Sequence, residues 1–136
     1  MNRYLLKSEP DAFSWAQQQA VAAEPWTGVR NAQAAAVLTS MAVGDQAFFY
    51  HSNVGKEIVG IVEVVRAAYP DPTDETGRWA CVDVRATEAL ARPVTLAAIK
   101  AEPRLEGMGL IRQSRLSCMA VSPEHWAVIR AMGGLA

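Results

Sequence analysis

Short apolar runs separated by turn residues occupy most of the chain, and their periodicity predicts a mixture of strands and helices. We expect strands where β-branched and aromatic residues cluster between Gly, Pro and Asp residues. The predicted strands cover residues 3–7, 46–51, 57–67, 79–87 and 116–121. The turns predicted between them lie at residues 43–45 and 54–56, and a loop is predicted at 69–78.

Capping residues mark four predicted helices between these strands. The first two predicted helices are 15–21, capped by Asp11 or Ser14, and 32–41, capped by Asn31. The third is 96–100, capped by Thr95. The last runs through Trp126 and Ile129, with Ser122 as its cap and Pro123 as its first helical residue. Glu24-Pro25 is expected to end the first helix, and Gly133-Gly134 follows the last one.

The resulting order is β-α-α-β-β-β-α-β-α, with consecutive central strands that are joined by turns and therefore antiparallel. Such an order predicts an α+β fold, a small mixed β-barrel with helices packed at its side and ends. The 136 residues predict a single domain over 1–136, which is long enough to form a core without a disulfide or a metal.

Net charge and apolar run length narrow the function classes. The net charge of −1 argues against a protein that holds duplex nucleic acid mainly by its phosphates, although it is neutral about a pocket for a single base. Apolar runs stay far below the roughly 20 residues of a membrane helix, and the N-terminal residues do not resemble a signal peptide. We therefore predict a cytoplasmic protein without membrane contact.

Cys81 and Cys118 lie in strand-like runs and are expected to be buried hydrophobic residues rather than a disulfide.

Three segments combine hydrogen-bonding and aromatic side chains at the ends of predicted elements: Ser8-Glu9-Pro10, Trp26 to Asn31, and Tyr50 to Asn53. Together they supply a carboxylate, an amide, an imidazole, hydroxyls, a guanidinium and flat rings. This set suits a flat, hydrogen-bonding ligand such as a nucleobase better than a metal. The side chains that we expect to line one shared cavity are Ser8, Trp26, Tyr50, His51, Ser52 and Asn53.

Each candidate in the first two segments also has a purely structural explanation. Ser8 either meets a base edge or caps a turn. Trp26 is either the wall of a base-stacking slot or part of the core. Arg30 either meets a phosphate or forms an ion pair with Glu9, whereas Asn31 is best explained as a helix cap.

Catalytic residues, metal ligands and cofactors are not predicted. His51 and Ser52, with Asp45, suggest a hydrolytic triad, but neighbouring residues in a strand point to opposite faces. Asn53 is better suited to pair with a base edge. The two His and two Cys residues lack the spacing of a metal site.

A set of motifs in a fixed order resembles the EVE domain family, over a span from Tyr4 to Trp126. These motifs are Leu6-Lys7-Ser8-Glu9-Pro10, Trp26-Thr27-Gly28-Val29-Arg30-Asn31, Gly44-Asp45, Phe49-Tyr50-His51-Ser52, Tyr69-Pro70-Asp71 and Arg115-Leu116-Ser117. The resemblance implies a PUA-like barrel with a pocket for a nucleobase, in particular a modified one in DNA or RNA. It implies no enzymatic activity. The predicted ligand-binding residues are Lys7, Ser8, Glu9, Trp26, Arg30, Asn31, Tyr50, His51, Ser52, Asn53, Arg115 and Ser117.

The chain departs from the family's usual pattern at the first strand and the second helix. Tyr4 stands where the family often has Trp, Ala32 where it often has Tyr, and Ala35-Ala36 where it often has Arg-Asn. These changes weaken the phosphate contact expected at the second helix.

Three classes of function stay open at this stage. The leading hypothesis is a non-catalytic reader of a nucleobase, which requires an aromatic slot with a basic rim. An enzyme acting on a nucleotide or nucleoside would require a buried carboxylate or lysine with a shifted pKa, such as Glu9 or Lys7. A protein-interaction module would require a filled pocket and an exposed apolar patch. The base, its modification and the oligomeric state are not specified by the sequence.

Overall fold

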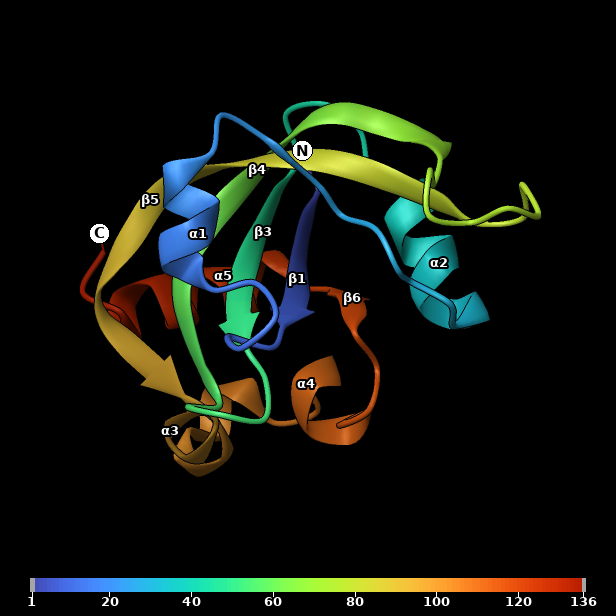
Figure 1. Cartoon of the computed structure of the whole chain (residues 1–136). Coiled ribbons are helices and arrows are strands. Elements are labelled where there is room, and N and C mark those ends of the chain that lie inside the picture. Colours follow the sequence, from blue (N-terminus) through green and yellow to red (C-terminus); the bar gives the residue numbers. More distant parts are fainter. Residues whose placement is uncertain (1, 136) are drawn as a thin grey trace.

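The computed structural model describes residues 2–135 and contains six strands interleaved with helices (Figure 1). In chain order the elements are β1 (Arg3–Ser8), α1 (Trp15–Ala20), β2 (Glu24–Pro25), α2 (Ala32–Thr39), β3 (Gln46–His51), β4 (Glu57–Pro70), β5 (Ala80–Thr95), α3 (Leu96–Ala101), the 3-10 turn η1 (Pro103–Leu105), α4 (Gly109–Arg112), β6 (Cys118–Ala120) and α5 (Pro123–Met132).

The strands form one mixed sheet in the order β2-β5-β4-β3-β1-β6. β1 runs parallel to β3, and all other neighbours are antiparallel. The β4–β5 pairing shifts register repeatedly between Ile58 and Tyr69, and such bulges bend a ribbon, as the long curved strands in Figure 1 show. The α+β fold with a mixed sheet is therefore confirmed. The sheet is not closed, because β2 and β6 form its two edges.

Side-chain caps begin the helices as the sequence predicts. Ser14, rather than Asp11, opens α1 through a reciprocal capping box with Gln17. The side chains of Asn31, Thr95 and Ser122 each accept a hydrogen bond from a backbone N–H in the first turn of α2, α3 and α5, respectively.

Several predicted boundaries are wrong. α1 ends at Ala20, and Glu24-Pro25 forms the short strand β2 against β5 instead of closing the helix. β4 and β5 extend to Pro70 and Thr95, well beyond the predicted ends. In the extension of β5 only Leu90 and Val94 are buried and the residues between them are exposed, so the apolar periodicity is weak, and pairing with β4 holds the strand extended. η1 and α4 were missed because each is only a single turn, and α4 lacks a side-chain cap.

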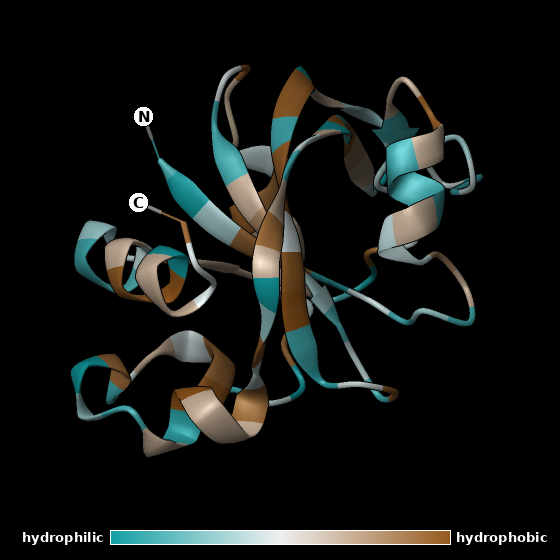
Figure 2. Cartoon of the chain, turned by 90° about the vertical axis from the view of Figure 1, so that its left-hand side faces the viewer, coloured by the Kyte–Doolittle hydropathy of each residue, from teal (hydrophilic) through white to brown (hydrophobic). Residues whose placement is uncertain are grey.

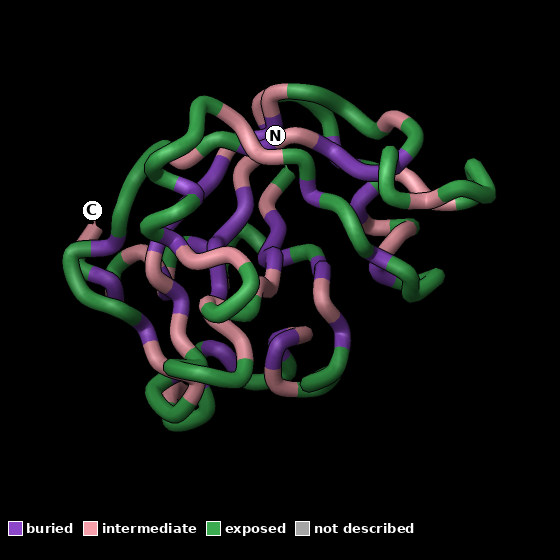
Figure 3. The backbone as a smooth tube through the Cα atoms, viewed as in Figure 1, coloured by how far each residue is buried: buried purple, intermediate pink, exposed green. Residues whose placement is uncertain are grey.

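The core lies on both faces of the central strands. On one face Phe48 stacks on Trp126 of α5, with ring centroids 3.9 Å apart. On the other face Phe49 packs edge-on against Trp15 and Trp26. Figure 2 shows hydrophobic residues concentrated in the strands between flanking helices, and Figure 3 shows the same strands buried.

Cys81 and Cys118 are buried free thiols, and burial raises the pKa of Cys118 to about 12.

Candidate functional site

The pairing of β1 with β3 divides the predicted site between the two faces of the sheet. Lys7 lies opposite Tyr50, and Ser8 lies opposite His51. Because successive residues of a strand point to opposite faces, Lys7 and Tyr50 share one face while Ser8 and His51 share the other. Two cavities result, one on each side of the end of β1.

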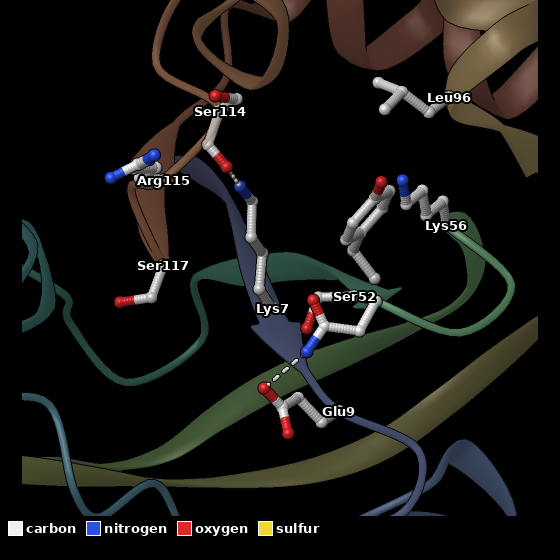
Figure 4. A pocket seen from close by; sticks show the side chains of 10 residues that line it. Lys7, Glu9, Ser52, Lys56, Leu96, Ser114, Arg115 and Ser117 are labelled. Atoms are coloured by element: carbon white, nitrogen blue, oxygen red, sulfur yellow. Dashed lines mark hydrogen bonds between the residues drawn. The ribbon is translucent and has the colours of Figure 1, made fainter.

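The first, which we call the aromatic cavity, has a volume of about 460 Å³. It is lined by Lys7, Ser8, Glu9, Ala12, Phe13, Glu24, Pro25, Trp26, Thr27 and Gly28. The second, the polar cavity, has a volume of about 560 Å³. It is lined by Lys7, Glu9, Tyr50, Ser52, Asn53, Lys56, Leu96, Ser114, Arg115 and Ser117, several of which Figure 4 shows. The cavities meet at Lys7 and Glu9, which line both.

Trp26 forms part of the wall of the aromatic cavity and also belongs to the core. Only 8% of the residue is exposed. Its ring meets Phe13 and Phe49 edge-on, at centroid distances of 6.3 and 5.6 Å. Trp26 is therefore a core residue, and the same packing holds its indole in place beside the cavity, whereas stacking on a base stays a prediction.

The polar side of the aromatic cavity consists of hydroxyl, carboxyl and backbone groups. The Ser8 hydroxyl donates a hydrogen bond to the Phe13 carbonyl, which fixes the loop before α1. Glu24 is half-buried, and its pKa is raised by burial and, second, by the neighbouring charge of Asp83. Thr27 is exposed at the rim.

A buried carboxylate holds the backbone that follows Trp26. Asp71 is 2% exposed and accepts hydrogen bonds from Gly28 N at 2.8 Å and Arg30 Nη1 at 3.0 Å. It also accepts bonds from the backbone and hydroxyl of Thr73. Burial raises the pKa of Asp71, but the bonds from Thr73, Gly28 and Arg30 outweigh burial and hold the pKa below its ordinary value. Gly28 has φ 84°, which suits glycine at this turn.

Arg30 and Asn31 therefore have structural roles. Arg30 pairs with Asp71 rather than with Glu9, and it also donates to Thr73 Oγ1 at 3.0 Å. The Asn31 side chain caps α2 by accepting from Ala34 N at 3.0 Å. Neither residue lines the aromatic or the polar cavity.

The polar cavity is crossed by Lys7, whose Nζ donates to the Ser114 carbonyl at 2.7 Å (Figure 4). Its ammonium lies 5.9 Å from the centroid of the Tyr50 ring. Burial lowers the pKa of Lys7 and raises that of Tyr50. Asn53 Nδ2 donates to Glu9 Oε1 at 2.6 Å, which links the segment after β3 to the segment after β1.

His51 lines neither cavity, so the prediction of one shared cavity is wrong. Its Nε2 accepts a hydrogen bond from Trp15 N at 3.0 Å, and its ring lies edge-on to Phe49 at 5.7 Å. Burial lowers its pKa, with a partly opposing effect of Glu57. His51 is a satisfied structural histidine whose accepting nitrogen is occupied, and Ser52 faces the polar cavity instead.

The remaining predicted residues are divided between the two cavities. Ser8 and Trp26 line the aromatic one, and Tyr50, Ser52, Asn53, Arg115 and Ser117 line the polar one. Sequence reasoning missed Phe13, Glu24, Thr27, Lys56 and Ser114 as lining residues. These side chains come from loops or segment ends without a periodic signal. Asp71 stood in the recognised Tyr69-Pro70-Asp71 motif, but only the fold brings it to Gly28 and Arg30.

Neither a metal site nor a membrane-spanning helix is found among the described residues. In residues 2–135, no group of three His, Cys, Asp or Glu side chains is arranged to hold a metal ion. Across that same span, the helices are all too short or too polar to cross a bilayer.

Comparison with known proteins gives consistent matches over the whole fold. The family model described as "EVE domain" matches residues 2–132. Thymocyte nuclear protein 1 of Gallus gallus is 33% identical in an alignment that covers 95% of this chain and 67% of that protein. A protein of Rhodopseudomonas palustris with an NMR structure is 54% identical, with a TM-score of 0.94 and coverage of 98% and 94%. The crystal structure of human THYN1 protein in complex with 5-methylcytosine-containing DNA has a TM-score of 0.93 at 29% identity, with coverage of 100% and 99%.

Proposed function

Since the chain belongs to the EVE domain family, we propose that it is a non-catalytic binding module that recognises a nucleobase, in particular a modified base in DNA or RNA. The observation that carries this proposal is the aromatic cavity, where the ring of Trp26 stands beside the carboxyl and hydroxyl groups of Glu24 and Thr27. The DNA complex of the human relative, which contains 5-methylcytosine, supports the same ligand class.

The chemistry of the aromatic cavity suits a base that has left its stack. Contact between a base and an aromatic ring contributes roughly 1–3 kcal/mol. The carboxylate of Glu24 accepts hydrogen bonds and therefore favours a base with an exocyclic amino group, such as cytosine or adenine. A base enclosed in this way must be extruded from a duplex or come from a single strand.

Calorimetric titration with nucleosides tests the proposal directly. We expect 5-methyl-2′-deoxycytidine to bind more tightly than thymidine, which lacks the amino group. A short oligonucleotide with one 5-methylcytosine should bind more tightly than the same strand with thymine at that position. Equal binding of both strands, with no measurable binding of either nucleoside, would refute base recognition.

The observation that favours an enzyme instead is Lys7. Its lowered pKa meets part of the requirement for a catalytic lysine, and it lies where the two cavities meet. We nevertheless propose binding without turnover, because the Lys7 ammonium is held by the Ser114 carbonyl. Incubation with modified nucleosides and oligonucleotides, followed by mass spectrometry, should reveal no product. A product that is lost in the Lys7→Met variant would reverse this assignment.

The cellular compartment remains a proposal from cysteine usage. Cys81 and Cys118 are free thiols buried in the sheet, a state that a reducing compartment preserves. We place the protein in the cytoplasm, and cell fractionation with an antibody against it would test this location.

A further inference from the structure

A third depression extends the polar cavity across the loop that follows α4. It has a volume of about 360 Å³ and shares Ser114 and Arg115 with the polar cavity. Its other lining residues are Asn31, which was predicted as a ligand-binding residue, and Gln33, Arg112, Gln113 and Leu116, and no acidic residue lines it. The two depressions together present a continuous surface that we call the basic band, defined by Lys7, Lys56, Arg112 and Arg115.

In the part of the chain that the structure describes, none of the four cations of the basic band forms an ion pair with a carboxylate. Four arginines outside the band form ion pairs with carboxylates, namely Arg30, Arg85, Arg104 and Arg130. Within the described residues, the side chains of Lys56, Arg112 and Arg115 form no hydrogen bond or ion pair, and all three residues are exposed. Glu9, the acidic residue of the band's lining, is bound by Asn53. A chain of net charge −1 thus places three exposed cations without a carboxylate partner along two adjoining depressions.

The basic band begins where the aromatic cavity ends. Lys7 and Glu9 line both the aromatic and the polar cavity, so a base inserted beside Trp26 has its sugar and phosphates next to the polar cavity. Arginines and lysines on such a path neutralise phosphates and release counterions. Amide and hydroxyl groups, here Gln113 and Ser114, are typical further phosphate contacts.

We infer that the phosphodiester groups flanking the recognised base lie in the basic band, so that the protein binds a segment of a nucleic-acid strand more tightly than an isolated nucleoside. This inference rests on the proposed function. It moves the expected phosphate contact from α2, where Ala32, Ala35 and Ala36 offer no charge, to the end of α4 and the loop after it, which carry Arg112 and Arg115, respectively.

The experiment measures the salt dependence of binding with the Arg112→Gln/Arg115→Gln double variant. The probes are 5-methyl-2′-deoxycytidine and a short single-stranded oligonucleotide with one 5-methylcytosine. For single strands each neutralised phosphate contributes about 0.7 to the slope of log affinity against log salt, so the double variant should lower this slope by about 1.4. A fourfold rise in salt, from about 50 to about 200 mM, should then weaken the wild type about sevenfold more than the variant.

The matched control is Arg92→Glu, which changes the net charge by the same two units on an exposed residue outside the basic band. Its slope should equal that of the wild type. The loss in the double variant should be larger for the oligonucleotide than for the nucleoside, which has no phosphate. An unchanged slope in the double variant, or an equal change in the control, would overturn the inference while leaving nucleoside recognition intact. A wild type that binds neither probe would instead refute the proposed function, and this inference with it.

Discussion

Asn53 donates a hydrogen bond of 2.6 Å to Glu9 and so joins the segments that follow β3 and β1. Both residues are exposed; Glu9 lies where the two cavities meet, and Asn53 lines the polar cavity. Asn53 has φ 64°, in the left-handed region that glycine adopts at little cost. The bond therefore orients the Glu9 carboxylate, while the backbone conformation at residue 53 does not depend on the amide.

The variant Asn53→Gly separates these two contributions. Unfolding stability should change by no more than about 0.5 kcal/mol, as at other surface positions. Affinity for 5-methyl-2′-deoxycytidine should fall by about 0.5–1.5 kcal/mol, the net value of a hydrogen bond, because Glu9 is no longer oriented. Calorimetry and denaturant titration of the same preparation measure both quantities. A large loss of stability with unchanged affinity would show that the bond only supports the fold.

Two variants of Trp26 distinguish its contribution to stability from its contribution to ligand binding. Trp26→Ala should destabilise the protein by about 3–5 kcal/mol, because the indole is buried against Phe13 and Phe49. Trp26→Phe retains a ring and should keep most of the stability, while ligand affinity falls within the roughly 1–3 kcal/mol that stacking contributes. Thermal melts and titrations check this. If Trp26→Phe melted far below the wild type yet bound equally well, the indole would serve the core alone.

Asp71 binds the backbone of Gly28, which lines the aromatic cavity. Removing the negative charge of Asp71 should therefore lower the stability of the fold. In Asp71→Asn the amide nitrogen would face the donors of Gly28 or Arg30, so we expect a loss of about 2–4 kcal/mol in unfolding free energy. Arg30→Gln should cost less, since the Arg30 side chain is 37% exposed. Denaturant titration gives the comparison. Equal costs for the two variants would contradict the assigned importance of the Gly28 bond.

His51 predicts an acid-dependent loss of stability. Its pKa is lower in the folded protein than the ordinary 6.5, so the unfolded chain binds a proton more readily. The stability that neutral His51 contributes is present above about pH 6.5 and is lost as the pH falls through the folded pKa. His51→Gln keeps an acceptor for Trp15 N but does not titrate, so its melting temperature should fall less between pH 7 and pH 5 than that of the wild type. If the melting temperatures of the wild type and of His51→Gln fell by the same amount between pH 7 and pH 5, the acid sensitivity would come from other groups.

The sequence supplied most of the element types because the caps and the central strands carry local signals. Ser14, Asn31, Thr95 and Ser122 all begin helices as predicted. The ends of β4 and β5 could not be predicted, since pairing between two long strands holds residues whose own pattern is polar. Local propensity does not contain that information.

The site was predicted as a set of residue types but not as a geometry. Ser8 and Tyr50 both belong to recognised motifs, yet they lie on opposite faces because β1 and β3 are paired with Ser8 opposite His51. The alternation was visible in each strand, whereas the parallel register that aligns the strands is a property of the whole sheet. In the same way the partner of Arg30, Asp71, is 41 positions away in sequence.

The position of β1 between β3 and β6 constrains the order in which the protein can fold. Residues 3–8 are synthesised long before one of their two partner strands, residues 118–120. During translation Tyr4, Leu5 and Leu6 therefore present an unpaired, apolar strand edge until residues 118–120 have also left the ribosome. Pairings of such long sequence separation also make folding slow. A chain truncated before residue 118 should consequently aggregate rather than fold, so chaperones that cover the nascent N-terminal segment would raise the yield of native protein.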